Sequence, residues 1–167
     1  MQTFTASAPG KIILFGEHAV VYGQPAIAVP VTQVQATATV EPIPGEMLGT
    51  GHIIAPQINL DAVMGELPPD NPLVTAIRNL QTALGAGEHL AFRLRIHSTI
   101  PVAAGLGSGA AVSAAVIRAF SAFLGRVLPD EDVSVLAYQV EKIHHGTPSG
   151  IDNTVVVYAR PVYFIRG

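Results

Sequence analysis

Apolar and polar residues alternate along two stretches of the chain. In residues 33–40, Val and Ala alternate with Gln and Thr, and in residues 92–97, Phe, Leu and Ile alternate with two arginines and a histidine. Because successive side chains of a strand point to opposite faces of a sheet, both stretches are predicted strands with one buried and one wet face. Residues 41–69 are rich in Pro and Gly and are predicted to be loop, with one short strand near 52–55.

Short, unbroken apolar runs predict the remaining strands. Residues 12–15 and 26–31 are bounded by Gly and Pro, which is typical of buried strands. Residues 155–158 and 162–165 predict a final strand pair joined by a turn at Arg160-Pro161.

Three stretches have apolar residues at the three- and four-residue spacing of an amphipathic helix. The first begins at Asn71-Pro72, an N-cap followed by proline, and ends at a Gly-Ala-Gly sequence. The second follows a glycine-rich segment and ends at Gly125, and the third begins at Pro129-Asp130. The predicted inner faces are Leu73, Ile77, Leu80 and Leu84; Val112, Val116, Ala119, Phe120 and Phe123; and Val133, Leu136, Ala137, Val140 and His144.

The resulting order is strands, helix, strand, two helices and strands. The 167 residues show no internal repeat and no low-complexity linker. This order predicts one mixed α+β domain rather than a regular alternation of strands and helices. The chain is long enough to bury a substantial core.

Composition adds a question about the surface. The chain is 49% hydrophobic and 13% charged, whereas charged residues make up about a quarter of a typical soluble domain. Either the domain is tightly packed with Ala and Val, or some apolar surface meets a partner or a second domain. The absence of cysteine excludes disulfides, thiolate nucleophiles and Cys-bound metals, and it fits a cytoplasmic protein.

Charge and hydropathy argue against two classes of partner. The 9 basic and 12 acidic residues give a net charge of −3 and no basic cluster, so no nucleic-acid partner is expected. The longest apolar tract, residues 102–124, opens with glycines and carries Arg118 well inside it, so no membrane span is expected. The N-terminus lacks the basic and apolar regions of a signal peptide.

The glycine-rich segment before the second helix carries the clearest chemistry. Residues 101–111 read Pro-Val-Ala-Ala-Gly-Leu-Gly-Ser-Gly-Ala-Ala. Glycines at alternate positions let backbone N–H groups converge on an anion, and the following helix N-terminus adds partial positive charge. A tight strand-to-helix turn is the plainer interpretation. No Gly-Lys-Ser/Thr closes the loop, so it is not a Walker A motif.

A dinucleotide-binding fingerprint is the main rival interpretation of this loop. Gly105-x-Gly107-x-x-Ala110 matches its spacing. That fingerprint, however, requires a strand that runs directly into the first glycine. Here the predicted strand ends near His97 and a Ser-Thr-Ile-Pro stretch intervenes, which favours a phosphate loop of another kind.

Two further segments place polar residues beside apolar runs. Lys11 precedes the first predicted strand, and Glu17 and His18 follow it. Near the third helix, Glu141 is followed by a bend rich in Gly and Pro that leads to Asp152. Taken alone, each pattern also fits ordinary turns, and Asp152 also fits a local cap. Zinc needs three or four suitably spaced ligands, so Glu17 and His18 alone do not predict a zinc site.

Together the three segments resemble the galactokinase, homoserine kinase, mevalonate kinase and phosphomevalonate kinase family. The strings are Pro-Gly-Lys followed by Gly-Glu-His-Ala-Val-Val-Tyr-Gly, then Gly-Leu-Gly-Ser-Gly-Ala-Ala, then His-Gly-Thr-Pro-Ser-Gly-Ile-Asp-Asn. The first and last are similar to the mevalonate kinase branch. The resemblance covers residues 8–153 and implies ATP-dependent, magnesium-assisted phosphorylation of mevalonate in isoprenoid precursor biosynthesis. Another kinase of the family, such as phosphomevalonate kinase, and a non-catalytic ligand-binding domain remain the alternatives.

The resemblance also implies roles for individual residues. Asp152 corresponds to the base that accepts the substrate hydroxyl proton, and Lys11 to the residue that pairs with it; both are also expected at the substrate. Glu17 and His18 correspond to the mevalonate-binding position. Glu141 corresponds to the magnesium ligand. The implied ATP-binding residues are Pro101, Ala104, Gly105, Leu106, Gly107, Ser108, Gly109 and Ala110.

The chain departs from the family pattern at Gly109. The family loop usually carries a second serine there, which helps to hold magnesium, so either Ser108 or a water takes its place. Family members are also roughly twice as long. The resemblance therefore implies that residues 1–167 form only the N-terminal kinase domain, similar to the second domain of ribosomal protein S5 with a left-handed β-α-β unit. Without a C-terminal domain, this fragment is expected to expose an apolar face, to self-associate and to bind ATP weakly.

Overall fold

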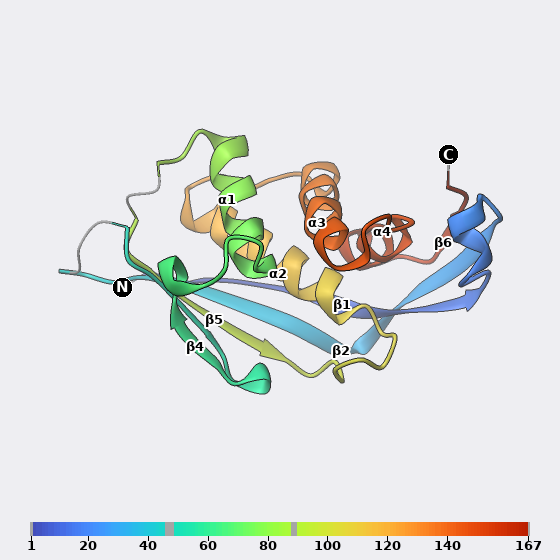
Figure 1. The fold of residues 1–167 in the computed structure, drawn as a ribbon, viewed down its shortest axis with the longest axis horizontal. Coiled ribbons are helices and arrows are strands. Elements are labelled where there is room, and N and C mark those ends of the chain that lie inside the picture. The colour runs from blue at the N-terminus through green and yellow to red at the C-terminus, as the bar shows by residue number, and fades with distance from the viewer. Residues whose placement is uncertain (1, 46–48, 88–89, 167) are drawn as a thin grey trace.

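The computed structural model describes residues 2–45, 49–87 and 90–166, except for the side chains of His144 and His145. These residues form a sheet whose one face is covered by helices, so the predicted α+β class is confirmed (Figure 1). The predicted inward position of His144 lies outside the described side chains. The strands are β1 (Phe4–Phe15), β2 (Ala26–Pro42), β3 (Gly51–Ala55), β4 (Leu60–Val63), β5 (Phe92–Ser98) and β6 (Val162–Phe164). The helices are α1 (Pro72–Leu84), α2 (Ser108–Phe123), α3 (Asp130–His145) and α4 (Ile151–Tyr158), with short 3₁₀ turns η1 (Ala19–Tyr22), η2 (Pro56–Ile58) and η3 (Met64–Glu66).

The strand order of the sheet is β1-β2-β5-β3-β4, and β6 pairs with the first residues of β2. β2 is antiparallel to β1, β5 and β6, whereas β3 and β5 are parallel. The chain passes from β3 to β5 through β4 and α1, so the predicted β-α-β unit lies here. Its left-handedness stays a prediction.

The core lies between the sheet and the helices. On β2, Ala36, Ala38 and Val40 are buried, whereas Thr37 and Thr39 between them are half-buried, as the alternation predicts. α2 is the central helix of the covering layer: it packs on β1, β2, α1, α3 and α4. Its small residues let it approach its neighbours closely, and Phe120 fills the space beside Phe92 with ring centroids 4.7 Å apart.

The predicted start and end of α1 are confirmed. The Asn71 side chain accepts a hydrogen bond from the Leu73 N–H at 3.0 Å, and Gly85 ends the helix in the left-handed conformation with φ +63°. Among the described residues, no helix is both long and apolar enough to cross a membrane.

Three sequence-based predictions of elements are wrong. Residues 155–158 form the end of helix α4 rather than a strand, because Val-rich runs fit either structure and the buried surroundings of Ile151, Val155 and Val156 decide between them. Residues 26–31 and 33–40 belong to one long strand. β4 lies within the predicted loop, where its weak alternation gave no signal.

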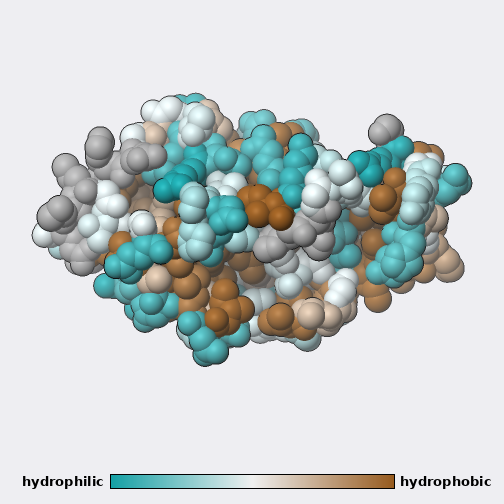
Figure 2. Space-filling view, in the orientation of Figure 1, coloured by the Kyte–Doolittle hydropathy of each residue, from teal (hydrophilic) through white to brown (hydrophobic). Residues whose placement is uncertain are grey.

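One end of the molecule exposes a group of large apolar residues where β1, β2 and β6 meet (Figure 2). Alternate residues of β1 are exposed there, and Ile27 of β2 lies beside Tyr163 of β6, whose exposed fraction is 69%. The members are Ile12, Leu14, Phe15, Val21, Tyr22, Ile27, Tyr163 and Ile165. We call them the apolar end.

Candidate active site

The loop between β5 and α2 has the backbone of an anion-binding nest. Ala103, Gly105 and Gly107 have φ values of +58°, +72° and +69°, while the residues between them have negative φ. Alternation of left- and right-handed conformations turns successive N–H groups toward one point, where an anion binds. Gly107 is also the N-cap of α2, so the helix dipole adds to this positive potential.

Lys11 is held against this loop by its backbone and by its side chain. Its N–H donates to the Leu106 carbonyl at 2.9 Å, at a place where the pairing of β1 with β2 shifts register. Gly10 and Gly107 permit the contact: a Cβ at Gly107 would lie 2.6 Å from the Lys11 Cγ, and one at Gly10 would lie 3.3 Å from the Leu106 carbonyl oxygen. The close packing leaves Lys11 only 5% exposed.

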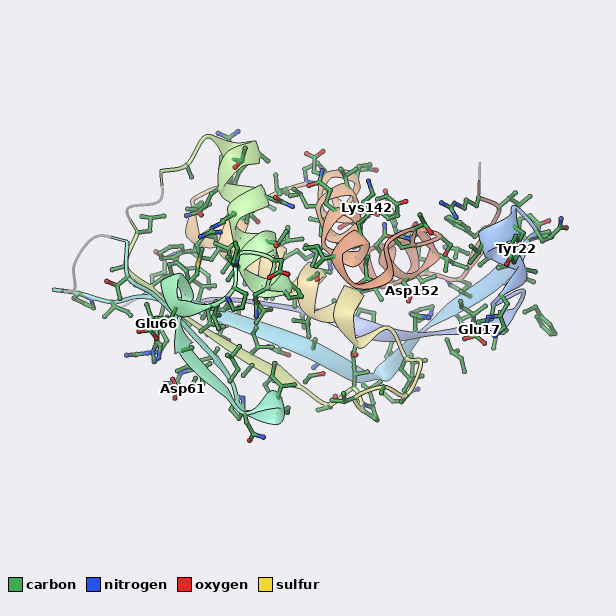
Figure 3. All side chains as sticks on the ribbon, viewed as in Figure 1. Glu17, Tyr22, Asp61, Glu66, Lys142 and Asp152 are labelled. Atoms are coloured by element: carbon green, nitrogen blue, oxygen red, sulfur yellow. The ribbon has the colours of Figure 1, made fainter. Side chains whose placement is uncertain are left out.

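The buried Lys11 forms an ion pair with Asp152, which lies in the first turn of α4. The distance from Lys11 Nζ to Asp152 Oδ1 is 3.0 Å, and the Asp152 side chain is 30% exposed. Figure 3 shows Asp152 at the start of α4, on the side of β1. The pair fixes the position of the Asp152 carboxyl group and leaves it accessible, which suits a proton acceptor.

The bend before α4 is fixed by hydrogen bonds on both sides. The Tyr138 hydroxyl donates to the Pro148 carbonyl at 3.2 Å, and the Thr154 hydroxyl donates to the Gly150 carbonyl at 2.7 Å. Gly150 has φ +91°, a conformation that favours glycine. The bend thus directs the start of α4, with Asp152, toward Lys11.

Glu141 is a second carboxylate at the same place. It lies on α3, is 4% exposed, and approaches Gly109 so closely that a Cβ there would lie 3.1 Å from Glu141 Oε1. In the described part of the chain, no three His, Cys, Asp or Glu residues gather into a complete metal site. Magnesium, however, needs only one or two protein oxygens when phosphates supply the others. Glu141, with the Ser108 hydroxyl in the same cavity, fits that requirement.

Two cavities meet at these carboxylates. The first, of about 400 Å³, is lined by Lys11, the loop residues Ala103 and Gly105 to Ala110, Glu141 and Asp152. The second, of about 350 Å³, is lined by Glu17, Glu141, Asp152 and the bend before α4, with Ile13 and Val21 as an apolar side. Asp152 and Glu141 are the lining residues that the two cavities share.

The structure brings together most of the predicted site residues, but not all. Lys11, Glu141 and Asp152 converge with the loop, and Glu17 lines the second cavity. Pro101 and Ala104 are exposed and line neither cavity. His18 is also exposed, precedes η1, and is not among the residues that line these cavities.

Sequence reasoning missed Ala103, whose positive φ contributes to the nest. Only glycines signalled such a backbone, and an alanine in this conformation gives no sequence signal. It also missed Asn153, which is buried and lines the second cavity. The Asn153 side chain donates to the Ser134 hydroxyl at 2.8 Å and thereby ties α4 to α3.

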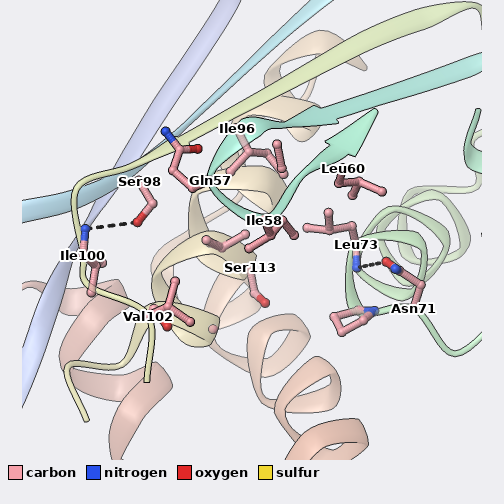
Figure 4. Close-up of a pocket in the computed structure, with 15 residues that line it drawn as sticks. Gln57, Ile58, Leu60, Asn71, Leu73, Ile96, Ser98, Ile100, Val102 and Ser113 are labelled. Atoms are coloured by element: carbon pink, nitrogen blue, oxygen red, sulfur yellow. Dashed lines mark hydrogen bonds between the residues drawn. The ribbon is translucent and has the colours of Figure 1, made fainter. Parts of the chain in front are cut away.

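A third cavity, of about 330 Å³, was also missed, because its walls come from segments far apart in the chain (Figure 4). It lies between β3, β5 and the start of α1, and shares Ser108 and Gly109 with the first cavity. Its walls are mostly apolar, with polar groups at Gln57, Asn71, Ser98 and Ser113.

A glycine-rich nest at a helix start, a buried lysine and two carboxylates thus lie together at two adjoining cavities. The model for "GHMP kinases N terminal domain" matches residues 71–160, more than half of the chain. The chain belongs to this family, so the resemblance seen in the sequence is confirmed.

Among its relatives, the chain is 34% identical to the mevalonate kinase of Pyrococcus furiosus over 175 residues, which cover 97% of this chain and 52% of that protein. The crystal structure of Methanococcus jannaschii mevalonate kinase superposes with a TM-score of 0.87 at 28% identity, over 99% of this chain and 54% of that one. Streptococcus pneumoniae phosphomevalonate kinase shares the fold alone, with a TM-score of 0.74 at 19% identity, over 92% of this chain and 47% of that one. The chain thus spans about half the length of the relatives that it matches.

Proposed function

We propose that the intact gene product transfers the γ-phosphoryl group of ATP to mevalonate and forms 5-phosphomevalonate, a step of isoprenoid precursor biosynthesis. The observation that carries this proposal is the Lys11–Asp152 pair, 3.0 Å long, at the junction of a phosphate-loop cavity and a second, partly polar cavity. This arrangement has a place for each reactant and a carboxylate between them. The similarity to mevalonate kinases supports the choice of mevalonate.

The first cavity binds the triphosphate in this proposal. The N–H groups of residues 103–110 donate to phosphate oxygens, and Lys11 neutralises charge on the group being transferred. The third cavity shares Ser108 and Gly109 with the loop and has apolar walls, so it accommodates the nucleoside. Pro101 and Ala104, which line neither the first nor the second cavity, shape the loop rather than contact the phosphates.

Glu141 and Ser108 would hold magnesium, since both line the cavity of the loop. When bound, the ion would neutralise charge on the triphosphate. The chain's own contribution is the placement of the Glu141 carboxylate, which burial on α3 fixes beside the loop.

The second cavity binds the acceptor alcohol. Asp152 orients the hydroxyl and accepts its proton while the alcohol oxygen bonds to the γ-phosphorus and the bond to the ADP oxygen breaks. Glu17 lies at the wall of this cavity, and His18 follows it at the start of η1. We propose that the His18 imidazole turns inward to donate a hydrogen bond to the mevalonate carboxylate.

A coupled ADP-release assay on the intact gene product tests the assignment. With MgATP, we expect turnover with mevalonate and little or none with phosphomevalonate, homoserine or galactose. Preference for one of the other three acceptors would move the protein to another branch of the family. Absence of turnover together with retained ATP binding would instead favour a non-catalytic ligand-binding domain.

A second test works on residues 1–167 alone. The chain contains two lysines, Lys11 and Lys142, and Lys142 is exposed above the Tyr138 ring. If Lys11 contacts the triphosphate, MgATP slows its modification by an amine-reactive reagent and leaves that of Lys142 unchanged. Equal rates at Lys11 with and without saturating MgATP would contradict the proposed ATP site. Cytoplasmic location and the predicted absence of a nucleic-acid partner stay predictions.

A further inference from the structure

Arg118 joins three helices at the side of the covering layer remote from the phosphate loop. It lies on α2, and one of its terminal nitrogens donates to Asp130 Oδ1 at 2.6 Å and to the Val157 carbonyl at 2.7 Å. Asp130 is the first residue of α3, and Val157 lies in the last turn of α4. The charge of Arg118 therefore sits where the negative end of the α4 dipole needs a cation.

α4 is a short helix whose position along its own axis is set by polar contacts. Its apolar residues, Ile151 and Val155 among them, pack against the sheet and the neighbouring helices. Such contacts are non-directional and resist sliding weakly, whereas hydrogen bonds fix both distance and angle. At the start of α4, Asn153 donates to Ser134 of α3; at its end, Arg118 donates to Val157.

The same region contains acidic groups that face these contacts. Desolvation, followed by the charges of Glu131 and Asp130, raises the pKa of Tyr158, the last residue of α4. The end of α4 therefore lies close to the acidic first turn of α3, and Arg118 is the cation that offsets this negative charge.

We infer that Arg118 is a positioning residue for Asp152. It fixes α4 along its own axis at the position where the Asp152 carboxylate contacts Lys11. Asp152 and Val157 are five residues apart, or about 7.5 Å along a helix. Ser108 and Arg118 are ten residues apart on α2, or about 15 Å. One guanidinium thus links the helix that begins at the phosphate loop to the helix that begins at Asp152.

This inference deepens the proposed function and rests on its assignment of Lys11 and Asp152, but its first test needs no activity. In residues 1–167, the rate at which an amine-reactive reagent modifies Lys11 reports how often the ion pair between Lys11 and Asp152 opens. We expect Arg118→Met to raise that rate about tenfold. Loss of a charge-assisted hydrogen bond shifts the equilibrium between the closed and the open ion pair by about that factor. Lys142 gives the reference rate in the same sample.

Three matched variants separate positioning from general loss of stability. Arg118→Lys keeps a cation that can donate to Val157, so it should restore most of the protection. Arg78→Met removes an exposed arginine of α1 and should change nothing. Ile77→Val trims a fully buried residue of α1 and lowers the Tm without touching α4. If Ile77→Val exposes Lys11 as much as Arg118→Met does for the same loss of Tm, the inference is wrong.

In the intact gene product, the kinetic signature is a split between kcat and KM. We expect Arg118→Met to lower kcat by ~10-fold or more, with KM for ATP changed little, because a misplaced base costs rate rather than nucleotide binding. If Arg118→Met exposes Lys11 to the reagent but leaves kcat unchanged, the Lys11–Asp152 pair is not needed for catalysis. That result would count against the proposed function. If Lys11 stays as well protected in Arg118→Met as in the parent chain, the positioning role is wrong. Asp130→Asn leaves the hydrogen bond from Arg118 to Val157 in place, so it should preserve the protection of Lys11.

Discussion

At the scale of single residues, the site depends on a lysine that is buried but not isolated. Lys11 is 5% exposed, and an unpaired charge at such a depth is unfavourable. Asp152 compensates that charge from the solvent-accessible side. The same contact that compensates the buried lysine also holds the Asp152 carboxyl group in one position between the two cavities.

Asp152→Asn tests the role of that carboxylate. In the intact gene product we expect kcat to fall by ~10²–10⁴-fold, the usual cost of losing a general base. ATP affinity should change far less, because Asp152 lies on α4 and not on the phosphate loop. Steady-state kinetics and a nucleotide titration give both values. Near-normal turnover would leave Asp152 with the local capping role that its sequence context also allows.

Gly109 gives a second test at this scale, because its missing side chain faces Glu141. A Cβ there would lie 3.1 Å from Glu141 Oε1, so any side chain displaces the carboxylate slightly. Gly109→Ala is expected to weaken divalent-cation binding, since it adds bulk and no oxygen. Gly109→Ser adds the same Cβ together with a hydroxyl that can coordinate or hydrogen-bond.

We therefore expect cation affinity to be higher in Gly109→Ser than in Gly109→Ala. Mn²⁺ binding followed by electron paramagnetic resonance, in the presence of ADP, measures this without any turnover. Equal affinities in the two variants would show that Ser108 or water already supplies the oxygen that the residue at 109 would add.

At the scale of elements, α4 ends in an unfavourable residue. Ala159 caps it with φ +49° and ψ +39°, where residues other than glycine are strained by roughly 1–3 kcal/mol. Ala159→Gly relieves that strain but raises the entropy of the unfolded chain, which costs about 0.4–1 kcal/mol. We expect a net gain in the free energy of unfolding of about 0.5–1 kcal/mol, measured by urea denaturation.

The half-buried Ala86, which follows Gly85 after α1 and does not have a positive φ, is the control for this variant. Ala86→Gly should be neutral or destabilising, because it adds freedom to the unfolded chain and relieves nothing. A loss of stability in Ala159→Gly equal to that in Ala86→Gly would show that the cap is not strained.

The elements that were predictable from the sequence are those with a regular period or a clear end signal. β5 and the second half of β2 alternate, and α1 carries both its N-cap and its terminal glycine. α4 was not predictable, since a run of β-branched residues favours a strand locally and only packing against α2, α3 and the sheet makes it helical. In α4, the burial of apolar side chains outweighs the local strand propensity of the sequence.

The site divides in the same way. The glycine-rich loop, Lys11, Glu141 and Asp152 could be chosen from the sequence, because their motifs occur together. Ala103 and the third cavity could not, since a positive φ on alanine and a cavity between distant segments leave no local pattern. In the sequence, Arg118 stands out only as a charge in an apolar tract. The structure shows that it donates hydrogen bonds to Asp130 of α3 and Val157 of α4.

At the scale of the whole molecule, the apolar end explains part of the unusual composition. Its exposed side chains lie on β1, β2, β6 and the adjoining segments, at the end of the molecule where β6 pairs with β2 (Figure 2). Large exposed apolar groups of this kind mark surfaces that bind another surface. We expect residues 1–167 alone to self-associate through the apolar end.

Light scattering over a concentration series measures this association. Leu14→Thr with Tyr163→Thr removes two exposed apolar side chains from the apolar end, and threonine preserves the strand propensity of both positions. This double variant should be more monomeric than the parent chain at every concentration. Val127→Thr removes an apolar side chain that is 90% exposed between α2 and α3, so it is the control that should not change the mass. A parent chain that stays monomeric at high concentration, or a Val127 variant that dissociates as much as the double variant, would show that the apolar end does not drive association.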